Sequence, residues 1–231
     1  MSLRVWLPLN GTLDNQGLDN VTITPNGVFS YIDGKLKQGL LCNGSSFLEI
    51  EGVTLDKEAS ITYWSKTSTN KKMAWVIVAT SSDKLNLYEN SLYSLNTGDG
   101  TNNPFQDSLG NTINVLHDDK WHHFAIIFNS NETKLYIDGL YRGNAKTFKD
   151  PTTTNEKIVR IGGGYNNTHT YDWNGMLNDF RIYDHALSSM EVKQISQGLV
   201  LHYPLNNIGI KEDIEYDCSG YCNNGIRIGN F

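Results

Sequence analysis

The chain has 231 residues and a mass of 26.0 kDa, enough for one large all-β domain or two small domains. Its net charge is −6 and its 19 Lys and Arg residues are scattered, which excludes nucleic acid as a main partner. No stretch approaches the roughly 20 apolar residues of a membrane span, and the first residues do not resemble a signal peptide. We therefore expect a protein that is made in a cytoplasm and is not inserted in a membrane. Its 3 cysteines are too few for a disulfide framework.

Short runs with two-residue alternation recur along the chain and predict β-strands. They are rich in β-branched and aromatic residues, and clusters of Gly, Asn, Asp and Ser separate them. The runs are VTITP, SFLEIEG, ASITYWSKT, MAWVIVAT, LNLYE, HHFAIIF, TKLYIDG, KIVRIGG and MLNDFRIYD. This spacing indicates a sandwich or a barrel. Within TKLYIDGLYRG, Asp138-Gly139 predicts a tight hairpin turn, because this dipeptide accepts positive φ angles.

One segment near the end of this region, ALSSMEVKQIS, predicts a short helix. Ser188 and Glu191 fit a capping box, and Leu187, Val192 and Ile195 fall close to one face. We expect this helix to close a single domain over residues 1–197.

The sequence LVLHYPLN, which begins at Leu199, echoes LRVWLPLN, which begins at Leu3. A repeat at this distance predicts that residues 198–231 are a connector and the start of a second, incomplete copy of the domain. So short a segment cannot bury a core of its own. The alternatives are that it docks onto the first domain or lies against a partner chain.

An ordered set of motifs resembles the laminin G-like, concanavalin A-like jelly-roll family. The motifs are DGKLKQGLLCNGSSFLEI (33–50), ASITYWSK (59–66), DDKWHHFAIIFNSNETKLYIDGLYRG (118–143), VRIGGGY (159–165) and WNGMLNDFRIYDHALSSMEV (173–192). The resemblance implies an all-β, two-sheet antiparallel jelly-roll sandwich with one short C-terminal helix. Folds of this kind serve lectins, glycosidases, adhesion modules and spacers, so function has to be argued from a site.

The opening stretch LRVWLPLNGTLDNQGLDNVTIT is similar to that of laminin G-like domains in bacteriophage tails and other virion parts. This second resemblance implies a location in the virion, with other virion proteins as partners. Homo-oligomers are common among such tail appendages, and many of them bind host-surface glycans.

Candidate catalytic groups are sparse. Glu49 and Glu51 alternate on one strand, as paired carboxylates of a glycosidase would, but Gly52 to Thr54 follow where a third acid is needed. His122 and His123 are adjacent and point to opposite faces of a strand, so they cannot share a zinc ion. The sequence therefore predicts a protein that is not an enzyme and has no catalytic residues.

Calcium is the metal that the family resemblance implies. The matching positions are Asp14 and Asp179, although the usual pair of aspartates has become Asn178-Asp179 in this chain. Calcium requires several oxygen ligands, and this change removes one charge. The alternative, which we favour, is that Asp14 caps a turn and Asp179 bonds neighbouring backbone. We expect no other cofactor.

Sugar recognition requires aromatic rings that stack on C–H faces, interleaved with amides and carboxylates that bond hydroxyls. A predicted loop has this composition and is the first candidate site; its residues are Tyr165, Asn166, Asn167, His169, Tyr171, Asp172 and Trp173. Tyr88 and Tyr93, beside a long polar loop, are the second. The alternative is that Trp173 and Tyr165 pack beneath their own loop.

These observations predict a non-enzymatic carbohydrate-binding or host-surface adhesion module of a phage tail, a fibre or a related virion protein. Its expected partner is a cell-surface glycan or polysaccharide. The alternative is a structural spacer or decoration domain that serves virion assembly without binding glycans. A glycoside hydrolase is a distant third reading.

Overall fold

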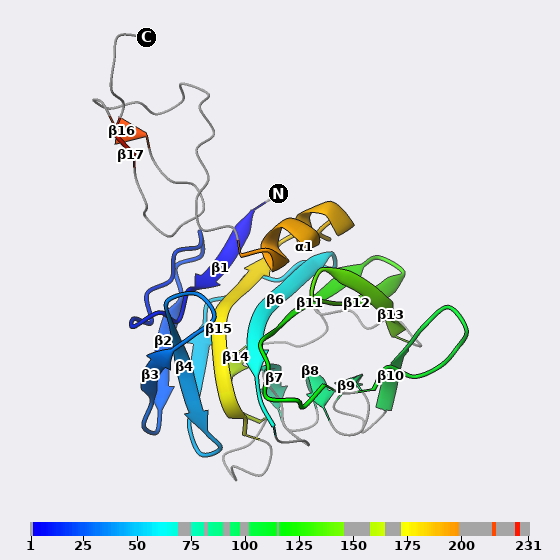
Figure 1. Cartoon of the computed structure of the whole chain (residues 1–231), viewed down its shortest axis with the longest axis horizontal. Coiled ribbons are helices and arrows are strands. Elements are labelled where there is room, and N and C mark those ends of the chain that lie inside the picture. The colour runs from blue at the N-terminus through cyan, green and yellow to red at the C-terminus, as the bar shows by residue number, and fades with distance from the viewer. Residues whose placement is uncertain are drawn as a thin grey trace.

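A computed structural model describes residues 2–68, 75–80, 83–89, 93–97, 102–114, 116–145, 158–164, 172–198, 214–215 and 225–226. Strands dominate the described residues, together with a single helix (Figure 1). The first eight strands are β1 (Leu3–Leu7), β2 (Thr22–Asn26), β3 (Ser30–Asp33), β4 (Gln38–Asn43), β5 (Phe47–Glu51), β6 (Ala59–Lys66), β7 (Trp75–Thr80) and β8 (Asp83–Glu89). The remaining elements are β9 (Tyr93–Thr97), β10 (Asn102–Gln106), β11 (His122–Asn129), β12 (Glu132–Ile137), β13 (Leu140–Ala145), β14 (Ile158–Ile161), β15 (Asn174–Tyr183), α1 (Ser189–Ser196), β16 (Ile214–Glu215) and β17 (Gly225–Ile226).

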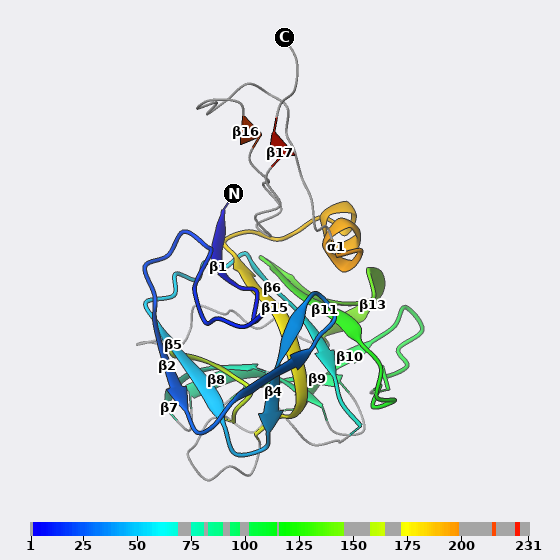
Figure 2. The ribbon, with the colours of Figure 1, turned by 60° about the vertical axis from the view of Figure 1, so that its left-hand side comes forward.

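The strands form two layers that face each other. One layer has the order β2-β5-β14-β7-β8-β9-β10, and the other has the order β13-β12-β11-β6-β15-β4-β3, with β1 also paired to β15. Strand β10 pairs with both β9 and β13 and so joins the layers at one edge. Every strand pairing among the described residues is antiparallel, and Figure 2 shows the two layers from the side. The predicted antiparallel sandwich with one short helix is confirmed.

The main core lies between the layers. Alternate residues of β6 and β11 point into it: Ile61 lies opposite Ile126, and the ring of Tyr63 stacks on Phe124 with 5.3 Å between centroids. The other face of the same two strands is buried as well, because α1 and the segment before it cover Ala125. The residues of β6 from Ala59 to Ser65 are all buried, as expected for a strand that is covered on both faces.

The two local signals read from the sequence are both present. Asp138 and Gly139 join β12 to β13 with φ angles of 54° and 75°, the positive values that a tight hairpin turn requires. Ser188 caps α1, its side chain accepting from the Glu191 N–H while the Glu191 carboxylate accepts from the Ser188 N–H. Of the predicted apolar face, Leu187 and Val192 are buried, and Ile195 is partly buried against the same cluster.

The predicted second repeat, residues 198–231, lies almost entirely outside the described residues. Gly198 follows α1, and β16 pairs with β17. The repeat stays a prediction. No helix in the described part of the chain is long and apolar enough to span a membrane.

Cys42 provides a test of core packing. It is fully buried on β4, and burial, reinforced by the negative charge of Asp172, raises the pKa of its thiol to about 12. Because only the thiolate is nucleophilic, we expect Cys42 to resist iodoacetamide in the folded protein and to react after unfolding in urea. Peptide mass spectrometry measures this directly, and alkylation of native Cys42 within minutes at mildly alkaline pH would contradict the packing.

Candidate functional site

Three segments are joined by hydrogen bonds at one end of the sandwich. The Gly44 N–H donates to the Trp173 carbonyl and the Trp173 N–H donates to the Gly162 carbonyl, each over 2.9 Å. The Gly164 N–H donates to the Asp172 Oδ1 atom, also over 2.9 Å. Gly164 and Asp172 flank residues 165–171 in the chain, so both ends of the predicted sugar-binding loop are attached to a rigid base.

Most of the predicted loop residues lie outside the described part of the chain, namely Tyr165, Asn166, Asn167, His169 and Tyr171. The two that are described have structural roles. Trp173 is fully buried in the main core, and Asp172 is fully buried with its carboxylate bonded to the loop backbone. An exposed stacking role for Trp173 is therefore excluded by its burial in the core, whereas the alternative that Trp173 and Tyr165 pack beneath their own loop stays a prediction, because that loop lies outside the described residues.

Burial also removes Tyr93 from the second predicted sugar-binding cluster. Tyr93 is fully buried, its hydroxyl accepts from the Leu116 N–H over 3.0 Å, and its ring meets Phe124 edge to face at 5.4 Å. It contributes to the core and offers no surface to a sugar. Tyr88 lies on β8, but its side chain is outside the described part.

A pair of exposed amides, which sequence reasoning did not single out as a pair, lies beside this base. Asn43 on β4 and Asn174 on β15 are direct cross-strand neighbours, and both are exposed. The Asn43 Oδ1 atom accepts from the Ser45 N–H over 3.0 Å and from the hydroxyls of Ser45 and Ser46 over 2.9 and 3.1 Å. This turn holds the amide rigidly at the surface. The cross-strand pairing of Asn43 with Asn174 is visible only in the folded chain.

Glu49 is not available as a catalytic carboxylate. Its Oε1 atom accepts from the Arg160 guanidinium, 2.9 Å from Nε and 2.7 Å from Nη2. The guanidinium also lies over the Phe47 ring and donates to the Gly164 carbonyl over 3.2 Å. Glu51 is exposed at the end of β5. The ion pair therefore connects the sheet to the base of the loop and leaves the two acids with different roles.

The predicted calcium residues do not fit a calcium site. Asp14 is exposed, whereas Asp179 is fully buried and its Oδ1 atom accepts from Trp6 Nε1 over 2.7 Å and from Arg181 Nε over 2.9 Å. A carboxylate that is already paired with a guanidinium is a poor calcium ligand. For Asp179 the favoured alternative was only partly right, because its carboxylate bonds two side chains and only its own N–H bonds backbone, at the Pro8 carbonyl. The turn-capping role of Asp14 stays a prediction. Among the residues the structure describes, no group of three metal-ligating side chains comes together.

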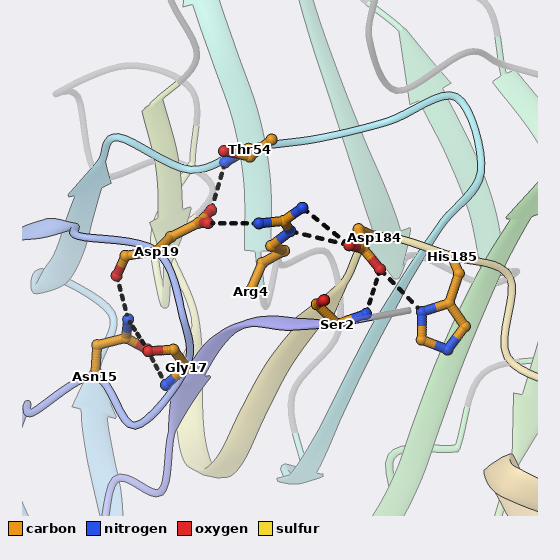
Figure 3. Close-up of polar contacts among 8 residues, drawn as sticks. All are labelled: Ser2, Arg4, Asn15, Gly17, Asp19, Thr54, Asp184 and His185. Carbon is orange, nitrogen blue, oxygen red and sulfur yellow. Dashed lines mark hydrogen bonds and ion pairs between the residues drawn. The ribbon is translucent and has the colours of Figure 1, made fainter.

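A separate polar cluster fastens β1 (Figure 3). Arg4 lies between two carboxylates, with Asp184 at 3.0 Å and Asp19 at 3.6 Å, and the Ser2 N–H donates to Asp184 over 2.6 Å. Asp19 also accepts from the Thr54 N–H over 2.7 Å. Partial burial opposes ionisation of Asp184, but its hydrogen bonds and Arg4 outweigh this and lower its pKa. The carboxylates and the Arg4 cation pair with one another, so we assign this cluster a structural role.

The layers, strand order and buried strand pairs define the class of two-sheet jelly-roll proteins. The Laminin_G_3 family profile, described as the concanavalin A-like lectin/glucanases superfamily, matches residues 42–193, more than half of the chain. The chain belongs to this family. No curated protein sequence matches it significantly.

Solved structures share the fold. Domain 4 of AbnA, an extracellular arabinanase of Geobacillus stearothermophilus in complex with arabinotriose, has a TM-score of 0.69 at 20% identity, covering 85% of this chain and 98% of that domain. The botulinum neurotoxin serotype D binding domain has a TM-score of 0.59 at 17% identity over 93% of this chain. The type G receptor-binding domain has a TM-score of 0.54 at 16% identity over 85% of this chain. The matches cover 54% and 51% of these two toxin domains, so the chain corresponds to about half of each.

Proposed function

We propose that this chain is a non-enzymatic carbohydrate-binding module whose ligand contacts the end of the sandwich around residues 165–171. The observation that carries this proposal is the rigid polar base there. Asn43 and Asn174 present neighbouring amides at the surface, and Gly164 and Asp172 attach a segment rich in tyrosine and asparagine. Amides and tyrosine rings are the groups that bond sugar hydroxyls and stack on sugar C–H faces.

The similarity to known structures supports the ligand class without identifying it. The arabinanase domain is bound to arabinotriose, and the toxin domains are receptor-binding domains. These proteins are less than 25% identical to this chain, so they share its fold, and the ligand has to be argued from this chain's own residues.

The same reasoning disfavours a glycoside hydrolase. A retaining glycosidase needs two carboxylates about 5–5.5 Å apart, one of them a nucleophile. In this chain Glu49 is held by Arg160, and Glu51 lies at a strand end.

Host-surface adhesion in a phage tail or related virion is the finer form of this proposal. It rests on the resemblance of the opening stretch to virion proteins, and it implies a virion location with other virion proteins, including copies of this chain, as partners. A spacer or decoration domain that binds no glycan is the competing function.

A glycan array followed by calorimetry with the full chain tests the proposal. We expect saturable binding that is lost in Tyr171→Ala and weakened about 5- to 10-fold in Asn43→Ala or Asn174→Ala, the effect of one lost hydrogen bond. Asn20→Ala is the matched control, because Asn20 is an exposed amide beside Gly52, near the opposite end of β5. All variants should keep the wild-type circular dichroism spectrum.

Two outcomes would redirect the proposal. Silence across host-derived polysaccharides would favour the spacer. Hydrolysis of a glycan that Glu49→Gln abolishes would show that the domain is an enzyme, because that substitution removes the Glu49 carboxylate while keeping the size of the side chain.

A further inference from the structure

The side chain of Asn178 bonds the backbone of two other segments, at Pro8 and at residues 36–38. It lies on β15 and is fully buried. Its Nδ2 atom donates to the Pro8 carbonyl over 2.7 Å and to the Gln38 carbonyl over 3.0 Å, and its Oδ1 atom accepts from the Leu36 N–H over 2.8 Å. The partners decide the orientation of the amide, since carbonyls only accept and a backbone N–H only donates.

The next residue, Asp179, bonds the same Pro8 carbonyl through its N–H, and its carboxylate is neutralised by Arg181. Asp179 pairs with Arg181 at 2.9 Å, and the guanidinium lies over the Trp6 ring, 4.6 Å from its centroid. The Asp179 N–H donates to the Pro8 carbonyl over 3.1 Å, so this one oxygen receives two N–H groups. The carbonyl oxygens here are therefore satisfied by the protein's own hydrogens, and the carboxylate is satisfied by its own cation.

We propose that the Asn178 amide nitrogen occupies the position of a cation, so that this domain keeps its fold without calcium. Two backbone carbonyls from different segments converge on that nitrogen within 3.0 Å of it. Hard cations such as calcium seek oxygen ligands of this kind, and a carboxylate at the same position would add a negatively charged third ligand to the two carbonyls. The amide at residue 178 satisfies both carbonyls with its own hydrogens, whereas a carboxylate there would face them with oxygen atoms and would favour a cation between them. This inference does not rest on the proposed function.

Thermal unfolding of the full chain in chelator and in millimolar calcium chloride tests whether the domain keeps its fold without calcium. The wild-type protein should unfold at the same temperature in both. A rise in its unfolding temperature with calcium would overturn the proposal, because a cation would then bind the natural chain.

Asn178→Asp tests whether the Asn178 amide nitrogen occupies the position of a cation. In chelator, its carboxylate would face two carbonyl oxygens, and we expect the unfolding temperature to fall by roughly 5–10 °C. Calcium should restore part of that loss by bridging the three oxygens, with water completing its coordination.

Asn178→Ala is the matched control, since it removes the same hydrogen bonds without supplying a carboxylate. It should be destabilised in both conditions and insensitive to calcium. If Asn178→Asp responds to calcium no more than Asn178→Ala, or stays unfolded with calcium present, the junction is not a cation position and the proposal fails.

Discussion

Asp179→Ala is expected to destabilise the domain by about 3 kcal/mol, because it leaves the largely covered Arg181 guanidinium, whose side chain is 12% exposed, without its carboxylate. Burial by itself would lower the pKa of Arg181, but the negative charge of Asp179 more than offsets this and raises it, so the guanidinium stays charged. Residue 179 also has a φ angle of 53°, which aspartate tolerates and alanine does not, and this adds about 1–2 kcal/mol of strain. Urea unfolding followed by tryptophan fluorescence measures the total.

Two further variants separate the charge from the backbone. Asp179→Asn keeps a residue that accepts the left-handed conformation and retains an acceptor for the Trp6 indole, so its cost reports the lost charge. Combining it with Arg181→Met removes the stranded cation while keeping apolar contact with the Trp6 ring. We expect the double variant to be more stable than Asp179→Asn alone. A cost below about 1 kcal/mol for Asp179→Ala would mean that the pair behaves as an exposed ion pair.

The features that sequence reasoning placed correctly are local ones. The Asp138-Gly139 turn and the Ser188-Glu191 capping box each depend on residues within four positions, and both are present. Two-residue alternation predicted the strands, because a strand that packs on a core must alternate its faces. Neither pattern depends on how distant segments meet.

The candidate site was harder to predict because it depends on contacts between segments that are far apart in the sequence. Glu49 and Arg160 are 111 positions apart, and their pairing follows only from β5 lying beside β14. Burial was missed for a related reason. An aromatic residue in a polar segment, such as Trp173, can face solvent or the core, and only the fold shows that its ring is fully covered.

We expect the free energy of unfolding to fall in mild acid because His123 is buried. It is fully buried, with its ring edge-on to Trp64 at 5.2 Å, and neither ring nitrogen has a hydrogen-bond partner among the described residues. Burial, with a smaller contribution from the positive charge of Arg181, lowers its pKa to about 3.

Acid destabilises the folded state because His123 binds a proton more weakly in the folded than in the unfolded chain. An unfolded histidine binds a proton below about pH 6.5, whereas folded His123 stays neutral, so acid favours the unfolded state. The free energy of unfolding should fall by up to about 1.4 kcal/mol per pH unit below about pH 6. Between about pH 6.5 and 4.5 most carboxylates remain ionised, so we expect His123 to contribute a loss of about 2 kcal/mol there.

His123→Phe isolates this contribution, because it keeps an aromatic ring against Trp64 and removes the titrating nitrogens. Its stability should fall less steeply than that of the wild type over the same pH range. The adjacent His122 is the control: its ring bonds the carboxylates of Asp138 and Asp118 at 2.7 and 3.1 Å, so it has partners when protonated. His122→Gln should therefore retain the steep acid loss. Urea midpoints measured across the pH range decide the matter, and parallel profiles for the wild type and His123→Phe would show that protonating this ring costs little, contrary to its burial.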